Sequence, residues 1–149
     1  MKNHKHAALQ FLGAITVSMA IGLAACVVHA DADIYRGLNA DKNGKVQLNP
    51  GTFRFNPGLS TFNTPSVVSA CNFRFTVKTN EHESPDPGYT GEVEGLEGYE
   101  AHFNNDPPGH WDIHQPEGVS EEDAAKAVSE YAKAHRGDRV VNGSRNDCK

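Results

Sequence analysis

Acidic side chains are absent from the first thirty residues, and Asp31 is the first Asp or Glu of the chain. The same segment starts with Lys2 and Lys5 and continues into an uncharged, mostly apolar run at 11–25. A positive start followed by an apolar run is typical of a secretory signal peptide. A core helix would need a polar face, which this run lacks. A retained membrane span is the second interpretation, because the residues after the run are acidic rather than basic.

The end of the apolar run predicts a lipid anchor. The tetrapeptide LAAC at 23–26 resembles the lipobox of bacterial lipoproteins, in which the cysteine is acylated and becomes the new N-terminus. The resemblance implies a signal peptide at 1–25 and a palmitate-carrying Cys26, whose acyl chains would anchor the protein stably in a membrane. By the same resemblance, Val27 after the cysteine favours the outer membrane.

A second cleavage site competes with the lipobox. Val28, His29 and Ala30 form an A-x-A-like sequence, and cleavage after Ala30 would release a free secreted protein. Both sites place the remaining chain outside the bacterial cytoplasm, either in the periplasm or beyond it.

Cysteine is scarce, with three residues in the chain. Either cleavage leaves Cys71 and Cys148 in the mature protein, and an even pair in an oxidising compartment predicts a disulfide bond. The bridge would connect the C-terminal tail to the middle of the chain.

Basic side chains are also few. Lys2 and Lys5 leave with the signal peptide, so 14 basic residues become 12 against 19 acidic ones, a net charge of −7. This balance excludes a nucleic-acid partner, which would need a basic surface, and electrostatic binding to anionic membranes. The lipid anchor is therefore the predicted membrane link. The length fits a short tether at 26–32 and a single domain at 33–149.

One helix is predicted at 121–135. Ser120 and Asp123 form a short-acid version of a capping box, and acidic residues in the first turn suit the positive end of the helix dipole. The helical spacing predicts a buried stripe, which consists of Ala124, Ala127, Val128, Tyr131 and His135.

The clearest strand is predicted at 71–78, where apolar and polar residues alternate. Shorter candidates lie at 33–38, 46–48, 52–55, 100–103, 110–114 and 139–142. The expected strands precede the single expected helix in the chain. This order predicts an α+β fold, with a small, mostly antiparallel sheet and one C-terminal amphipathic helix packed on it.

Two segments suggest metal ligands, and each has a simpler interpretation. The segment 39–46 resembles the start of a calcium loop, although an Asn-Gly turn explains the same residues. His110, Asp112 and His114 would share one face of a strand, where they could begin a zinc or other transition-metal site, with His102 as a further ligand. The same alternation fits a half-buried strand with a solvated outer face.

Three short motifs resemble bacterial mono-ADP-ribosyltransferase toxins. Arg36 stands in a first strand (IYRG), Ser60 in a Ser-Thr segment (STF), and Glu92 and Glu94 in an E-x-E pair (EVE). The resemblance implies that Arg36 binds an NAD phosphate and that Ser60 supports the site. It also implies that Glu94 stabilises the developing charge on the ribose and that Glu92 orients an acceptor.

The sequence has no nucleotide-binding loop, catalytic-triad order or nucleophile elbow. It therefore favours an exported, lipid-anchored binding or interaction domain. The alternative is an ADP-ribosyltransferase-like toxin or effector that uses NAD as its cofactor. The ligand and any protein partner are left open.

Overall fold

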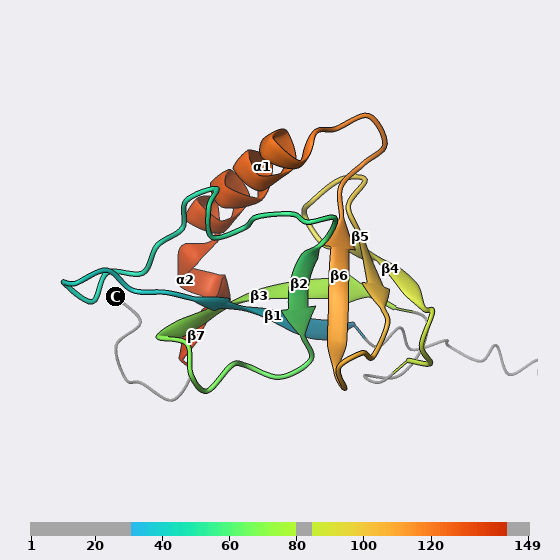
Figure 1. Cartoon of the computed structure of the whole chain (residues 1–149), viewed down its shortest axis with the longest axis horizontal. Helices are drawn as coiled ribbons and strands as arrows, with labels where there is room; N and C mark the ends of the chain where they lie inside the picture. The colour runs from blue at the N-terminus through green and yellow to red at the C-terminus, as the bar shows by residue number, and fades with distance from the viewer. Residues whose placement is uncertain (1–30, 80–84, 143–149) are drawn as a thin grey trace, which may run out of the picture.

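The computed structural model describes residues 31–79 and 85–142, and Figure 1 labels its elements. In chain order these are β1 Ala32–Leu38, β2 Leu59–Phe62, β3 Cys71–Lys78, β4 Thr90–Val93, β5 Glu100–Phe103, β6 His110–His114, α1 Glu121–Ala134, α2 Arg136–Arg139 and β7 Val140–Asn142. None of the helices in these ranges is both long enough and apolar enough to cross a membrane.

Six strands form a closed antiparallel barrel in the order β1-β2-β6-β5-β4-β3. β1 closes the ring because it pairs with β2 on one side and with β3 on the other. The β1–β3 ladder is the longest and runs from Ala32 opposite Val77 to Leu38 opposite Cys71. The second edge of β3 is divided between β4 at one end and β7 at the other, so β7 extends the sheet outside the ring.

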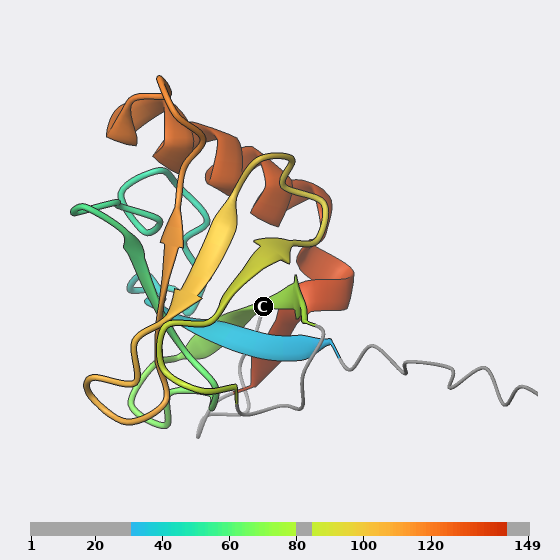
Figure 2. The same cartoon turned by 90° about the vertical axis from the view of Figure 1, so that its right-hand side faces the viewer.

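The expected α+β fold, an open sheet with a helix packed on it, is therefore wrong. The protein is mainly β, and its sheet closes on itself. Figures 1 and 2 show α1 lying across one end of the barrel rather than along a sheet face. The physical reason is the β1–β3 pairing, which removes two edges that an open sheet would leave exposed.

The helix was predicted well at its start and less well on its buried face. The Ser120 hydroxyl accepts a hydrogen bond from the Asp123 N–H at 3.1 Å, as the capping pattern predicts. Ala124, Val128 and Tyr131 are buried as expected, whereas Ala127 is exposed and His135 is half-buried. The buried face also includes Ala125, Ser129 and Ala132.

The strands at 71–78, 100–103 and 110–114 are confirmed, and the strand expected at 33–38 is β1. The expected strand at 52–55 is wrong: this segment is a turn and irregular chain, although its Phe53 and Phe55 are buried. The expected strand at 46–48 amounts to a single bridge between Val46 and Ala40. At 139–142, α2 ends and β7 begins.

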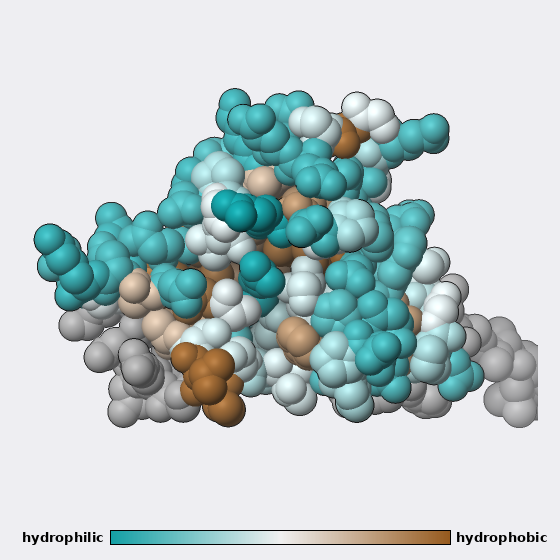
Figure 3. All heavy atoms as spheres, viewed as in Figure 1, coloured by the Kyte–Doolittle hydropathy of each residue, from teal (hydrophilic) through white to brown (hydrophobic). Residues whose placement is uncertain are grey.

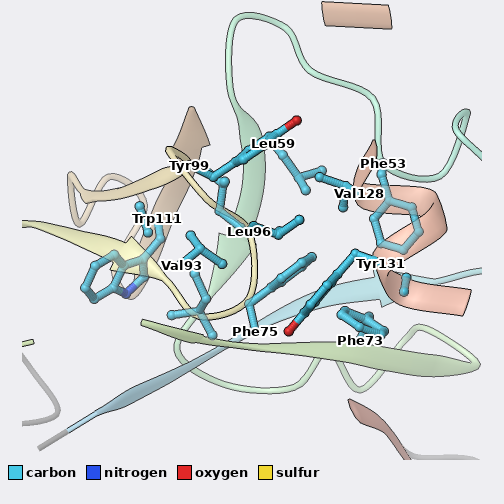
Figure 4. Packing of buried hydrophobic residues seen from close by; sticks show 14 of the residues in the cluster. Phe53, Leu59, Phe73, Phe75, Val93, Leu96, Tyr99, Trp111, Val128 and Tyr131 are labelled. Atoms are coloured by element: carbon cyan, nitrogen blue, oxygen red, sulfur yellow. The ribbon is translucent and has the colours of Figure 1, made fainter. Parts of the chain in front are cut away.

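Aromatic side chains fill the barrel and its helix-covered end (Figure 4). Phe73 packs edge-on against Phe53, Phe75 and Tyr131, with ring centroids 4.9–6.1 Å apart. The Tyr131 hydroxyl donates to the carbonyl oxygen of Glu94 at 2.9 Å, which ties α1 to the turn after β4. The packed core thus fixes the positions of the strands, and polar side chains project from the outer faces of these strands.

Candidate functional site

A cavity of about 600 Å³ opens on the outside of the barrel between β1, β2 and the segment that follows β2. Its size lies in the range of small-molecule sites. The lining is partly apolar and rich in hydroxyl groups, with one cationic side chain: Tyr35, Arg36, Gly37, Ser60, Phe62, Thr64, Pro65, Ser66, Val67 and Ser69.

Arg36 lies where β1 and β2 separate, because these strands have a single registered pair, Tyr35 opposite Phe62. Beyond the pair of Tyr35 and Phe62, the Arg36 guanidinium donates hydrogen bonds to backbone carbonyl oxygens. Its Nε donates to the carbonyl oxygen of Thr52 at 3.2 Å, and its Nη1 donates to that of Ser60 at 3.1 Å. Burial lowers the pKa of Arg36, yet a guanidinium stays protonated at neutral pH.

The described part of the chain offers Arg36 no carboxylate within ion-pair distance. An arginine has five N–H donors, and two are used on backbone carbonyls. Arg36 is therefore a charged lining residue of the cavity with donors left for a further partner.

A buried side-chain amide fixes the part of the cavity wall that contains Ser66. Asn72 is fully buried in β3, where it accepts from the Ser66 N–H at 2.8 Å and donates to the Ser66 carbonyl at 3.2 Å. Ser69 donates to the Ser66 hydroxyl at 3.1 Å, and a Cβ at Gly37 would collide with the Ser69 hydroxyl oxygen. These contacts fix the hydroxyl-rich wall against β1.

The segment after β2, which contributes Val67 to the cavity lining, carries two exposed apolar side chains. Val67 and Val68 are 68% and 87% exposed. The strongest brown patch in Figure 3 lies at the lower edge of the molecule, where Figure 1 shows the connection between β2 and β3.

Ser60 forms a hydrogen bond with a histidine of the neighbouring strand β6. Its hydroxyl oxygen lies 2.7 Å from Nε2 of His110, and Nδ1 of the same ring lies 2.8 Å from Oδ1 of Asn104. The Asn104 amide nitrogen donates to Oδ2 of Asp112 at 2.8 Å, and Oδ1 of Asp112 lies 3.7 Å from His110 Nε2. Phe62 packs edge-on against the His110 ring, with centroids 5.1 Å apart.

The residues of the ADP-ribosyltransferase resemblance fall into two groups. Arg36 and Ser60 line the same cavity. Glu92 and Glu94 line a different hollow, beside Lys78 and the turn at 94–98. The barrel order places β6 and β5 between the strand of Ser60 and the strand of Glu92.

The three residues expected to begin a metal site contact different neighbours, although Oδ1 of Asp112 lies 3.7 Å from Nε2 of His110. His110 contacts Ser60 and Asn104, whereas the His114 ring lies tilted by 39° against that of His102, with ring centroids 4.3 Å apart. Burial, followed by the neighbouring His102, lowers the pKa of His114. Across residues 31–79 and 85–142, no group of three or more His, Cys, Asp or Glu side chains is arranged to hold a metal ion.

The segment that resembles a calcium loop forms the simpler turn. The Asp41 carboxylate accepts from the N–H groups of Asn43 and Lys45 at 2.8 and 2.9 Å, and Gly44 has a φ of +79°. The carboxylate thus stabilises its own loop as an Asx turn does.

The two sites that depend on cysteine involve residues without described placement. Cys26 and Cys148 lie outside the described residues, so lipidation and the disulfide remain predictions. Cys71 is fully buried at the start of β3.

The sequence singled out Arg36 and Ser60 through the ADP-ribosyltransferase resemblance, and His110 and Asp112 as possible metal ligands. It did not predict a role for Asn72 or Asn104. The fold and site define a small closed barrel with a cationic, hydroxyl-lined cavity on its outer face. Comparison with protein families, curated proteins and solved structures finds no match for this chain.

Proposed function

We propose that this protein is an extracytoplasmic binding domain, anchored to a membrane through Cys26, whose cavity takes a small ligand with an anionic group. The observation that carries the proposal is Arg36, a lining residue of the cavity whose guanidinium has no carboxylate partner in the described residues. A partly buried cation without a counter-ion is costly, and an anionic ligand would offset that cost.

The chemistry of arginine supports a carboxylate or phosphate as the anionic group. A guanidinium presents paired N–H donors that match the two oxygens of such an anion. The Thr52 and Ser60 carbonyls hold the Arg36 side chain in place, so binding would require little further ordering. The hydroxyls of Thr64, Ser66 and Ser69 supply neutral partners for the rest of the ligand.

NAD use is the second candidate function, and one observation favours it. Arg36 and Ser60 share one cavity, as the resemblance to ADP-ribosyltransferases implies. The two glutamates of that resemblance line a different hollow, so the transferase step is not part of the proposal. NAD is retained as a probe because its pyrophosphate is an anionic group.

A thermal-shift experiment on the full chain in detergent tests the proposal, with inorganic phosphate, citrate and NAD as anionic probes and glucose as the neutral control. At least one anion is expected to raise the melting temperature, because a ligand that binds only the folded state stabilises it. The shift should disappear in Arg36→Gln and persist in Arg54→Gln, since Arg54 is exposed and lies outside this cavity. No shift with any anion, or equal shifts in Arg36→Gln, would contradict the proposal.

A further inference from the structure

The hydroxyl of Ser60 lines the cavity and also ends a chain of three side chains, Ser60–His110–Asn104. Anion binding by Arg36 does not require this chain. Its members come from β2, from β6 and from the turn between β5 and β6, so the barrel assembles them.

The Asn104 amide has a defined orientation. Its Oδ1 accepts from the Asp106 N–H at 3.0 Å, and its Nδ2 donates to the Asp112 carboxylate at 2.8 Å. The atom that faces His110 Nδ1 is therefore an acceptor. It follows that neutral His110 carries its proton on Nδ1 and presents a lone pair on Nε2.

This tautomer makes Ser60 the donor in the 2.7 Å contact, with its hydroxyl proton directed at His110 Nε2. A hydroxyl that donates to an imidazole held from the other side has the arrangement of an activated nucleophile and its general base. The Asp112 carboxylate, 3.7 Å from Nε2, would stabilise the imidazolium that forms when the proton moves.

We infer that Ser60 is the nucleophile of an acyl-transfer reaction on small carboxylic esters, with His110 as the general base and Asn104 as a positioning residue. The inference rests on the proposed function in one respect, namely that the cavity admits a small ligand. Arg36 lines the same cavity and supplies the positive charge that the reaction needs at the substrate oxygen.

In the first half-reaction, Ser60 Oγ forms a bond to the ester carbonyl carbon, and its proton passes to His110 Nε2. The carbonyl electron pair moves onto oxygen, where the Arg36 guanidinium stabilises the negative charge. The bond to the leaving alcohol then breaks, and that alcohol takes the proton from His110. The product is an acyl ester of Ser60.

In the second half-reaction, water attacks the acyl carbon and gives a proton to His110. The bond to Ser60 Oγ breaks, the serine oxygen recovers the proton from His110, and a carboxylic acid leaves. Ester and water are the reactants, and no oxidant or reductant is involved.

The test is covalent labelling of the full chain in detergent by a fluorophosphonate, which transfers its phosphonyl group to a nucleophilic serine with loss of fluoride. Intact-mass and peptide mass spectrometry should find one adduct, on Ser60, and none in Ser60→Ala. Ser120→Ala is the control, since Ser120 caps α1, lies outside this cavity and has no histidine partner among its hydrogen bonds, and this variant should label at the wild-type rate.

Two variants test the roles of the partners. His110→Gln should slow labelling by about 10²-fold or more, the usual contribution of a general base. Asn104→Leu should slow it by about 10²-fold through misplacement of the imidazole. The same variant should lose the preference for a proton on His110 Nδ1, which long-range ¹H–¹⁵N correlation spectra measure. Melting curves establish that each variant is folded.

The labelling of the wild type and of His110→Gln decides the inference. An absent adduct, an adduct on another residue, or equal labelling of a folded His110→Gln would overturn the inference. A wild-type protein that binds phosphate at Arg36 and forms no adduct would overturn it and leave the proposed function standing. An adduct on Ser60 without anion binding would support the nucleophile and contradict the proposed ligand.

Discussion

The Ser60 hydroxyl oxygen lies 2.7 Å from Nε2 of His110, although fifty positions separate the two residues in the chain. The antiparallel register of β2 and β6 pairs Ser60 with Asp112 and Phe62 with His110, so Ser60 and His110 are diagonal neighbours on the outer face. This placement connects the cavity beside Arg36 to a polar network on β6.

The first prediction concerns the His110 tautomer. Because Asn104 Oδ1 accepts from Nδ1, we expect the neutral imidazole to carry its proton on Nδ1. Long-range ¹H–¹⁵N correlation spectra at alkaline pH measure which nitrogen is protonated. A protonated Nε2 at His110 would show that the Asn104 amide has the opposite orientation.

The second prediction concerns the structural role of Arg36. Arg36→Gln removes the donors to the Thr52 and Ser60 carbonyls, and we expect a loss of about 1–3 kcal/mol in the free energy of unfolding. Urea unfolding of the variant and of the exposed control Arg54→Gln measures the difference. Equal stability of all three proteins would mean that water replaces the guanidinium at both carbonyls.

The third prediction concerns pH. Burial and then His102 lower the pKa of His114 below its ordinary value of 6.5, while Asp112 and Glu100 act in the opposite direction. The unfolded chain therefore binds this proton first as the pH falls. The free energy of unfolding should decrease as the pH falls through 6.5 toward the lower folded-state pKa.

The measurement compares urea unfolding at pH 7.5 and about pH 5.5 for the wild type and His114→Gln, a range set by the ordinary pKa of histidine. The variant should lose less stability between the two conditions. If both proteins lose the same amount, His114 makes no contribution to the pH dependence.

The fourth prediction concerns the anchor. Metabolic labelling with palmitate should mark the protein in a bacterial host that processes lipoproteins, and Cys26→Ser should abolish the label. The exposed Arg54→Gln is a control that leaves the lipobox and all three cysteines intact. An unlabelled wild-type protein that begins at Asp31 would favour cleavage after Ala30 instead.

Local signals explain which parts of the fold were predictable. The alternation at 71–78 and the cap at Ser120 depend on neighbouring residues, and both elements formed where expected. Phe53 and Phe55 alternate in the same way, yet their segment has no partner strand and forms a turn. Alternation of apolar and polar residues indicates which side chains are buried. Whether the backbone forms a strand depends on a neighbouring strand with which it can form hydrogen bonds.

The closure of the barrel could not be predicted from local sequence patterns. The ladder between β1 and β3 joins residues that are distant in the chain, and an alternating strand looks the same in an open sheet as in a barrel. The same limit applies to the site. Arg36 and Ser60 were singled out by short motifs, while Asn72 and Asn104 became recognisable through their bonds to Ser66 and His110.

The central claim is that the cavity beside Arg36 is an anion site, and anomalous diffraction tests it most directly. Crystals of the protein soaked in selenate should show a selenium peak in the cavity, with anion oxygens within about 3 Å of the Arg36 guanidinium. The peak should be absent from crystals of Arg36→Gln and present in crystals of Arg54→Gln. An empty cavity in the soaked wild-type crystals, or an unchanged peak in Arg36→Gln, would contradict the claim.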